Sequence, residues 1–325
     1  MTLPALAADH PPIELARVAF TQLTGEHVER IAPLSRGWGH LSWTVRTASG
    51  RYLIKTGIRR PYQCDLYRQV AAQQLAAAGG VATPLVVAVG DGGGPLQRPC
   101  YVQTWIEGTD GATALARLDA GGTARFGRAL GQAMAALHRI PGPRFAEDCA
   151  GTITYPSWQA ACTARLQRLV SATEKAEALP APILYAVADR LTALIDGLNG
   201  DITPRLTHRD AYLPNTLLLN DDPGTAALLD WEAAAFYDPV WDFVKLGMWV
   251  FDTHPQLRDP FLAGYTTHTA LPEGFEERLT VYQGIEYLAA FPYFGAAWPD
   301  EGMLDGFRKL LAGWMDRHHL AGARP

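Results

Sequence analysis

Three polar residues in the second half of the chain have the types and spacing that phosphoryl transfer requires. Asp210 and Asn215 stand five residues apart in the segment 208–215, and Asp230 follows fifteen residues later at the end of an apolar run. One carboxylate can orient an attacking hydroxyl, while an amide oxygen and a second carboxylate can hold Mg²⁺. The set therefore predicts Asp210 as the catalytic residue and Asn215 and Asp230 as metal ligands.

A second group of residues, in the first third of the chain, is suited to binding phosphate. Lys55 ends a β-type run and is the only lysine before residue 105. A point cation at such a position neutralises phosphate oxygens. Upstream of it, Gly37 and Gly39 allow the backbone to approach a phosphate closely, and Ser42 adds a hydroxyl. We expect these four residues to bind the phosphates of a nucleotide.

The elements that must position these residues change in type along the chain. Short β-type runs at 28–34, 41–47, 52–56, 85–89 and 100–105 enclose one long helical segment, 62–78, which Gly79-Gly80 ends. After residue 108 the pattern is mainly helical, at 126–138, 157–170, 183–198, 240–251, 275–291 and 304–318. We therefore predict an α+β chain of two lobes. Residues 1–104 form a small antiparallel sheet with one long helix, and residues 105–325 form a mainly helical lobe.

Composition and charge exclude several classes of protein. The 325 residues contain 48% hydrophobic residues, enough for substantial cores, and no membrane span or signal peptide is apparent. Four scattered cysteines are typical of a reduced, cytoplasmic protein. The net charge is −5, and no extended basic run suits nucleic acid. We therefore predict a cytoplasmic protein that binds neither nucleic acid nor membrane, and leave its oligomeric state open.

Together these residues resemble the aminoglycoside phosphotransferase and choline-kinase-like family, which has the two-lobed protein-kinase-like fold. The resemblance covers residues 34–246, and its most specific part is Asp230-Trp231-Glu232 followed by Asp238 and Asp242. Around residues 62–78 and Trp158 the chain is most similar to hygromycin-type phosphotransferases.

The family resemblance also implies how the co-substrate binds. It implies ATP or GTP together with Mg²⁺. It further implies that the hinge strand offers backbone groups of Gln103, Thr104 and Trp105 to the purine.

The chain departs from the family pattern on the long helix, and several residues near the motif have structural or open roles. The family expects a glutamate on the long helix as partner of Lys55, yet residues 62–78 contain none. Gln69, Gln73 and Asp65 are the alternatives. His208 is expected to be structural, as are Asp238, Asp242 and Glu232, and the role of Arg209 is open.

The C-terminal helices are expected to supply the acceptor site. From Glu232 onward thirteen acids face seven bases, which favours a cationic small-molecule substrate. We predict substrate contacts at Asp252, Glu286, Asp300 and Glu301. The predicted activity is O-phosphorylation of an aminoglycoside or a related aminocyclitol or sugar. The alternatives are a kinase of a primary metabolite such as choline, homoserine, a thio-sugar or a fructosamine, and a nucleotide-binding pseudokinase that acts as a regulator.

Overall fold

The computed structural model describes residues 11–34, 40–57, 63–198 and 200–320, with the side chains of 63–65 excepted. Its first part is an antiparallel sheet with strand order β1-β2-β3-β5-β4 and two accompanying helices. The elements are α1 (Ile13–Thr24), β1 (Arg30–Leu34), β2 (His40–Arg46), β3 (Arg51–Gly57), α2 (Gln63–Ala78), β4 (Val86–Asp91) and β5 (Pro99–Thr104). Helix α1 packs on one face of the sheet, where Phe20 is fully buried against Val45 and Val102.

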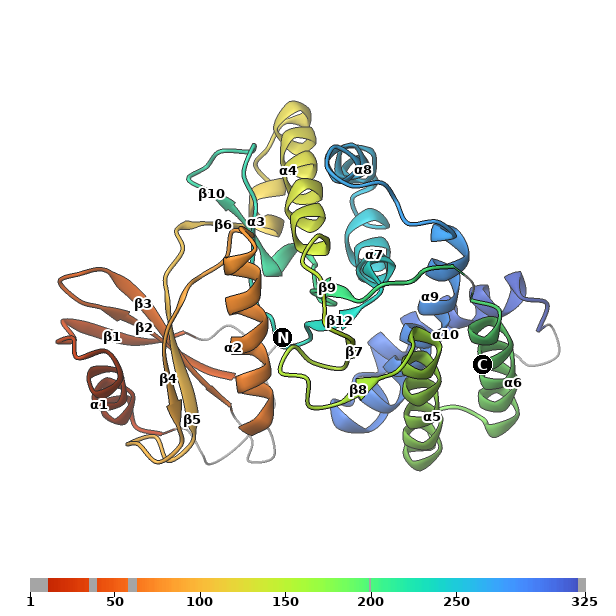
Figure 1. Cartoon of the computed structure of the whole chain (residues 1–325), viewed down its shortest axis with the longest axis horizontal. Helices are drawn as coiled ribbons and strands as arrows, with labels where there is room; N and C mark the ends of the chain where they lie inside the picture. Colours follow the sequence, from red (N-terminus) through yellow and green to blue (C-terminus); the bar gives the residue numbers. More distant parts are fainter. Residues whose placement is uncertain (1–10, 35–39, 58–62, 199, 321–325) are drawn as a thin grey trace.

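Helix α2 lies between this sheet and the rest of the molecule (Figure 1). Its first half faces the sheet, where Leu66 and Val70 pack with Tyr101 of β5. Its second half belongs to a different core, in which Ala72 and Ala76 are buried together with Phe126, Leu130 and other residues of the second part. Because small alanines allow close approach, one helix contributes to the cores of both parts. The orientation of α2 is therefore fixed from two sides.

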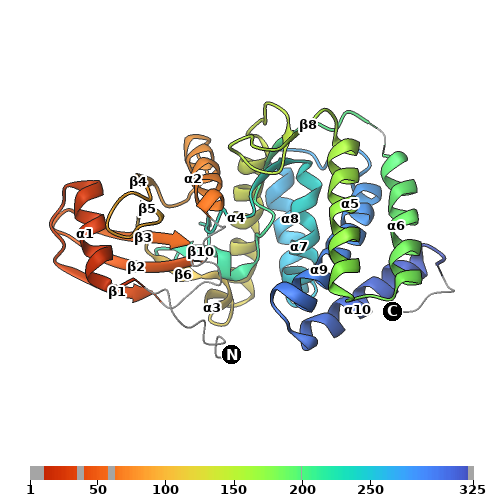
Figure 2. The same ribbon diagram turned by 90° about the horizontal axis from the view of Figure 1, so that it is seen from below.

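The second part is mainly helical, with short strands near the first part. Its strands are β6 (Gly108–Asp110), β7 (Phe145–Ala146), β8 (Thr154–Tyr155), β9 (Arg205–Thr207), β10 (Thr216–Leu219), β11 (Ala227–Leu228) and β12 (Ala235–Tyr237). Its α-helices are α3 (Gly111–Leu115), α4 (Ala120–His138), α5 (Trp158–Ala176), α6 (Ala181–Asp196), α7 (Asp242–Leu246), α8 (Arg258–Thr266), α9 (Phe275–Pro292) and α10 (Glu301–Arg317). Figure 2 shows α5 and α6 at the end of the molecule remote from the sheet. Among the described residues, no helix is both long and apolar enough to span a membrane.

Two glycines bring α4 and α8 into direct backbone contact. A Cβ atom on Gly131 would lie 2.0 Å from the carbonyl oxygen of Phe261, and one on Gly264 would lie 2.1 Å from that of Arg128. The close packing places His138, the last residue of α4, beside Tyr265 of α8, with 2.8 Å between His138 Nδ1 and the tyrosine hydroxyl. The contact thus fixes the position of a buried histidine.

The α+β architecture predicted from the sequence is confirmed, with differences in detail. All five predicted strands of the first part and its long helix are present. Residues 240–251, predicted as one helix, divide into a 3-10 turn (η3, Pro239–Trp241), α7 and a π-helical turn (η4, Gly247–Phe251). Helix α8 was not predicted, because Gly264 and Thr266 are weak helix formers, and the segment is stabilised as a helix by its packing on α4. The boundary at 104/105 coincides with the end of β5 but stays a prediction.

Replacing Gly131 with alanine is expected to destabilise the protein. The added methyl group has no space beside the α8 backbone, so the two helices must separate, at a cost of about 1–3 kcal/mol in the free energy of unfolding. Gly306→Ala in α10 is the matched control, because a Cβ there meets no atom within 4 Å. The control should be neutral or stabilising by up to about 1 kcal/mol. Urea unfolding of both variants tests this, and equal stabilities would contradict the close contact.

Candidate active site

Asp210 lies in the 208–215 loop, which follows β9 and ends in a 3-10 turn (η2, Leu213–Asn215). Its backbone and side chain form hydrogen bonds with several residues. Its backbone N–H donates to His208 Nδ1 at 3.3 Å. The Asn215 amide nitrogen donates to both the carbonyl oxygen of Asp210 (3.0 Å) and its Oδ2 (2.8 Å). Lys245 Nζ donates to the remaining oxygen, Oδ1, at 2.7 Å. Both carboxylate oxygens of Asp210 therefore have a defined donor.

The buried carboxylate of Asp242 fixes the start of the same loop. It accepts the backbone N–H groups of His208 (2.9 Å) and Arg209 (2.5 Å), and His138 Nε2 lies 2.8 Å from its Oδ2. Arg209 has a left-handed backbone (φ 62°), which is costly for a residue with a side chain and persists only when neighbours enforce it. Burial alone would raise the pKa of Asp242, but the hydrogen bond and charge of His138 outweigh it, so the pKa is lowered. Asp242 thus holds the loop in a strained shape.

His208 and Asp238 also have structural surroundings. The His208 ring is fully buried, packs 4.7 Å from the Trp231 ring and places Nε2 2.9 Å from the carbonyl oxygen of Leu229. Asp238 is buried and accepts the hydroxyl of Tyr282 at 2.5 Å. These contacts agree with the expected structural roles. The guanidinium of Arg209 lies 4.4 Å above the Tyr237 ring, so this residue also braces the loop.

Asp230 joins the two parts of the molecule. It follows β11 with φ 64°, and its Oδ1 accepts both Lys55 Nζ of β3 (3.1 Å) and the side-chain amide of Gln69 of α2 (2.9 Å). Burial would raise the pKa of Asp230, but the Lys55 ammonium outweighs it and lowers the pKa. Burial disfavours the charged form of Lys55 in turn, yet Asp230 raises its pKa. Ser42 lies directly opposite Lys55 in the β2–β3 pairing.

The residue paired with Lys55 is thus Asp230, and neither glutamine replaces the expected glutamate. Gln69 donates to Asp230, and Gln73 donates to the carbonyl oxygen of Pro84 (2.6 Å) and to Gln103 Oε1 (3.0 Å). The side chain of Asp65, the third alternative, lies outside the described residues, as do Gly37 and Gly39.

The donor chemistry around Asp230 fits a magnesium ion. The Asn215 nitrogen is turned to Asp210, which leaves the amide oxygen as the free end of that side chain. Asp230 Oδ2 is not used by Lys55 or Gln69. A hard cation prefers oxygen ligands of this kind. Glu232, expected to be architectural, is 43% exposed and lies with His40 and Asp230 in a cluster whose ligand atoms are within 4.8 Å of one another.

The strand expected to bind the purine is well bonded within its own lobe. The backbone N–H groups of Thr104 and Trp105 donate to the carbonyl oxygens of Leu85 (2.9 Å) and Arg51 (2.8 Å). The Gln103 side chain is engaged by Gln73. These two N–H groups are therefore already used, and the contact of Gln103, Thr104 and Trp105 with a nucleotide stays a prediction.

The acids predicted to bind substrate are dispersed, and three have internal partners. Glu286 is held by Arg165 (2.7 Å) and by the indole N–H of Trp241 (3.0 Å). Asp300 caps α10 by accepting the N–H of Met303, and Glu301 pairs with Arg308. Asp252 follows η4 and is exposed. Sequence periodicity cannot reveal that a carboxylate already has a partner from another helix, and contact of these four residues with substrate stays a prediction.

Lys245 was not singled out from the sequence, although it touches Asp210. Two signals in the sequence could have identified it. It stands three residues after Asp242, on one face of a helix, and it is one of only four lysines in the chain.

Residues 30–277 match the model of the phosphotransferase enzyme family, APH. The chain belongs to this family. The small-molecule kinase class predicted from the sequence is thereby confirmed. A search of curated proteins finds no match to the sequence.

Solved structures show the same two-lobed, protein-kinase-like fold in this phosphotransferase. A candidate aminoglycoside phosphotransferase from Ralstonia eutropha JMP134 is 14% identical with a TM-score of 0.67, covering 95% of this chain and 98% of its own. A candidate fructosamine-3-kinase from Thermobifida fusca YX-ER1 is 20% identical with a TM-score of 0.65, covering 91% and 99%. The aminoglycoside phosphotransferase APH(4)-Ia, in a ternary complex with ADP and hygromycin B, is 16% identical with a TM-score of 0.66, covering 91% and 99%. At these identities the likeness concerns the fold alone.

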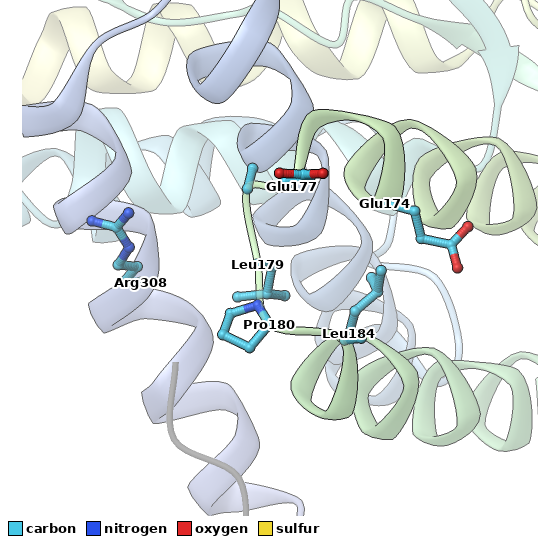
Figure 3. A pocket seen from close by; sticks show the side chains of 8 residues that line it. Glu174, Glu177, Leu179, Pro180, Leu184 and Arg308 are labelled. Atoms are coloured by element: carbon cyan, nitrogen blue, oxygen red, sulfur yellow. The ribbon is translucent and has the colours of Figure 1, made fainter.

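A cavity of about 630 Å³ lies away from these residues, at the α5–α6 connection of the phosphotransferase. Figure 3 shows Leu179 and Pro180 on one side of it and Arg308 of α10 on the other. None of the predicted nucleotide, metal or catalytic residues lines it. The chemistry of the family therefore has to be sought in the region of Asp210 and Asp230, where the polar residues converge.

Replacing Asp242 with asparagine is expected to destabilise the phosphotransferase in a pH-dependent way. An amide cannot accept all three donors, so the free energy of unfolding at pH 7 should fall by about 2–4 kcal/mol. The lowered pKa of Asp242 means that its contribution is complete above the unfolded value, about 3.9, and disappears as the pH falls through the lower folded value. The difference from wild type should therefore narrow below about pH 4.

Urea unfolding between pH 7 and pH 3.5 measures this difference. Asp189→Asn, at an exposed position of α6, is the matched control and should stay within about 0.5 kcal/mol of wild type. A pH-independent difference for Asp242→Asn would argue against an ionised carboxylate at this position.

Proposed function

We propose that the protein transfers the γ-phosphate of ATP or GTP to a hydroxyl of a small molecule, which is an aminoglycoside or a related aminocyclitol or sugar. The observation that carries this proposal is the fixed carboxylate of Asp210, with donors on both oxygens, close to the Lys55–Asp230 pair. Asn215 connects the two, because its side chain donates to Asp210 and its carbonyl oxygen accepts the N–H of Leu229, the residue before Asp230, at 2.8 Å. The proposed catalytic carboxylate and the proposed phosphate-binding lysine are thus connected through Asn215 and Asp230.

In this proposal Asp210 accepts a hydrogen bond from the acceptor hydroxyl and directs its oxygen at the γ-phosphorus. Phosphoryl transfer depends on positioning and charge stabilisation more than on strong base chemistry, so an ordinary carboxylate suffices. Lys55 exchanges Asp230 for phosphate oxygens of the nucleotide, with residues 1–104 as the nucleotide-binding lobe. Asn215 and Asp230 would hold Mg²⁺, which neutralises negative charge on the phosphates. The four residues needed are all present, which disfavours a pseudokinase.

A cationic acceptor is supported by the charge of the second lobe, where residues 232–325 contain thirteen acids and seven bases. Asp252 is exposed and the side chain of Glu232 is 43% exposed, so both are accessible to an ammonium group. Similar structures include complexes of other phosphotransferases with hygromycin B and with spectinomycin. The candidate fructosamine-3-kinases among the similar structures favour a second function, phosphorylation of a glycated amine or another primary metabolite. For either function we propose a cytoplasmic location, where nucleoside triphosphates are abundant.

A nucleotide-consumption screen separates these functions. Purified protein with Mg²⁺ and either ATP or GTP is offered aminoglycosides, aminocyclitols, fructosamines, choline, homoserine and thio-sugars, and products are identified by mass spectrometry. A product 80 Da heavier than an aminoglycoside or aminocyclitol supports the first function, and one derived from a metabolite supports the second. Nucleotide binding without any phosphorylated product across the panel would contradict both.

Replacing Asp210 with asparagine is expected to abolish turnover while leaving nucleotide binding intact. Asparagine keeps the size of the side chain but removes the negative oxygen that aligns the hydroxyl, so kcat should fall at least about 100-fold. The dissociation constant for nucleotide, measured by calorimetry, should stay within about threefold, because Asp210 is not one of the predicted phosphate ligands. Asp189→Asn serves again as the control for a lost surface charge. Wild-type turnover in Asp210→Asn would remove Asp210 from the mechanism.

A further inference from the structure

Lys245 makes the closest polar contact to the side chain of Asp210. Its Nζ lies 2.7 Å from Asp210 Oδ1, with 30% of the lysine side chain and 21% of the aspartate side chain exposed. The pair is therefore neither a fully solvated surface contact nor a buried one, and a ligand can reach both groups. Of the four lysines in the chain, two lie on the two aspartates of the candidate site, Lys55 on Asp230 and Lys245 on Asp210.

The contact restricts the rotation of the Asp210 carboxylate by holding its Oδ1. The terminal torsion of an aspartate is broad, so a carboxylate held at one oxygen can still swing about its Cβ–Cγ bond. Asn215 holds Oδ2 at 2.8 Å, and Lys245 holds Oδ1. Donors on both oxygens fix the plane of the carboxylate group. Each oxygen keeps a second lone pair, which remains available to an incoming hydroxyl.

Helix α7 holds the loop at two points, one on the backbone and one on the side chain. Asp242, the first residue of α7, accepts the N–H groups of His208 and Arg209, and Lys245 is three residues further on the same face. A helical turn is rigid, so the distance between these two contacts is set by the helix. The Asp210 carboxylate is thereby placed relative to its own backbone.

We propose that Lys245 is a positioning residue that orients Asp210 for alignment of the acceptor hydroxyl. The proposal rests on the function proposed above. Nucleotide affinity does not depend on Lys245, because its side chain acts on the acceptor side of the reaction.

The test compares Lys245→Met, Lys245→Arg and a matched control, Lys309→Met, at an exposed position of α10. Lys245→Met should lower kcat for acceptor phosphorylation about 100-fold, the loss expected for a misplaced reacting group. The dissociation constant for nucleotide should stay within about twofold. Lys245→Arg, which keeps a cation, should recover at least about a tenth of the wild-type kcat. Lys309→Met should match wild type throughout.

A residue with only a structural role would give a different pattern. Turnover of Lys245→Met within twofold of wild type, or parallel losses of nucleotide affinity and kcat, would overturn the proposal. In the Asp210→Asn background, Lys245→Met should cause no further loss of kcat, because the carboxylate it orients is gone.

A measurement without turnover distinguishes this proposal from the proposed function itself. Melting temperatures of Lys245→Met, Asp210→Asn and the variant that carries both substitutions form a thermodynamic cycle. A paired Lys245 and Asp210 give shifts that do not add. Additive shifts would overturn the pairing, whereas a coupled pair in a protein that phosphorylates no acceptor would refute the proposed function alone.

Discussion

The geometry of the candidate site depends on the hydrogen bonds that the carboxylate of Asp242 accepts. It is buried on α7, and its two oxygens receive donors from two other segments of the chain: α4 through His138, and the 208–215 loop through two backbone N–H groups. A buried charge is tolerated only when such donors satisfy it. The strained backbone at Arg209 is therefore maintained by a carboxylate of α7 that α4 holds in place through His138.

Asp230 has a comparable role between the two lobes. One oxygen of this residue accepts a hydrogen bond from β3 and another from α2, so the sheet, the long helix and the end of β11 meet at one atom. Helix α2 is itself packed into the cores on both sides. The indole N–H of Trp231 donates to Thr83 at 2.8 Å, which adds a further bond between the lobes next to Asp230. The relative position of the lobes is thus encoded close to the residues predicted to bind nucleotide and metal.

The sequence predicted the fold, and it singled out Asp210, Asn215 and Asp230 as candidate site residues, because both rest on local signals. Period and turn residues reveal the strands and the long helix, and the spacing of Asp210, Asn215 and Asp230 is short enough to read directly. What it did not predict depends on partners supplied by other elements. Lys245 reaches Asp210 from α7, Gln69 bonds to Asp230 and not to Lys55, and Glu286 is occupied by Arg165 of α5. Helix α8 was missed for the same reason, because its glycine, Gly264, is required by the close contact with α4, which the sequence of α8 does not reveal.

The presence of Gln69 on α2, where a glutamate is expected, affects the binding free energy of an anion at Lys55. If α2 carried a glutamate beside Lys55, the lysine ammonium would keep that carboxylate as a partner when an anion bound to it. Here the amide of Gln69 is neutral and its nitrogen is bonded to Asp230, so Asp230 is the one carboxylate that the described residues place in contact with Lys55. Any anion that takes Lys55 must displace this contact. The binding free energy of that anion is then a difference between two ion pairs, and it is smaller than the contact with Lys55 alone would give.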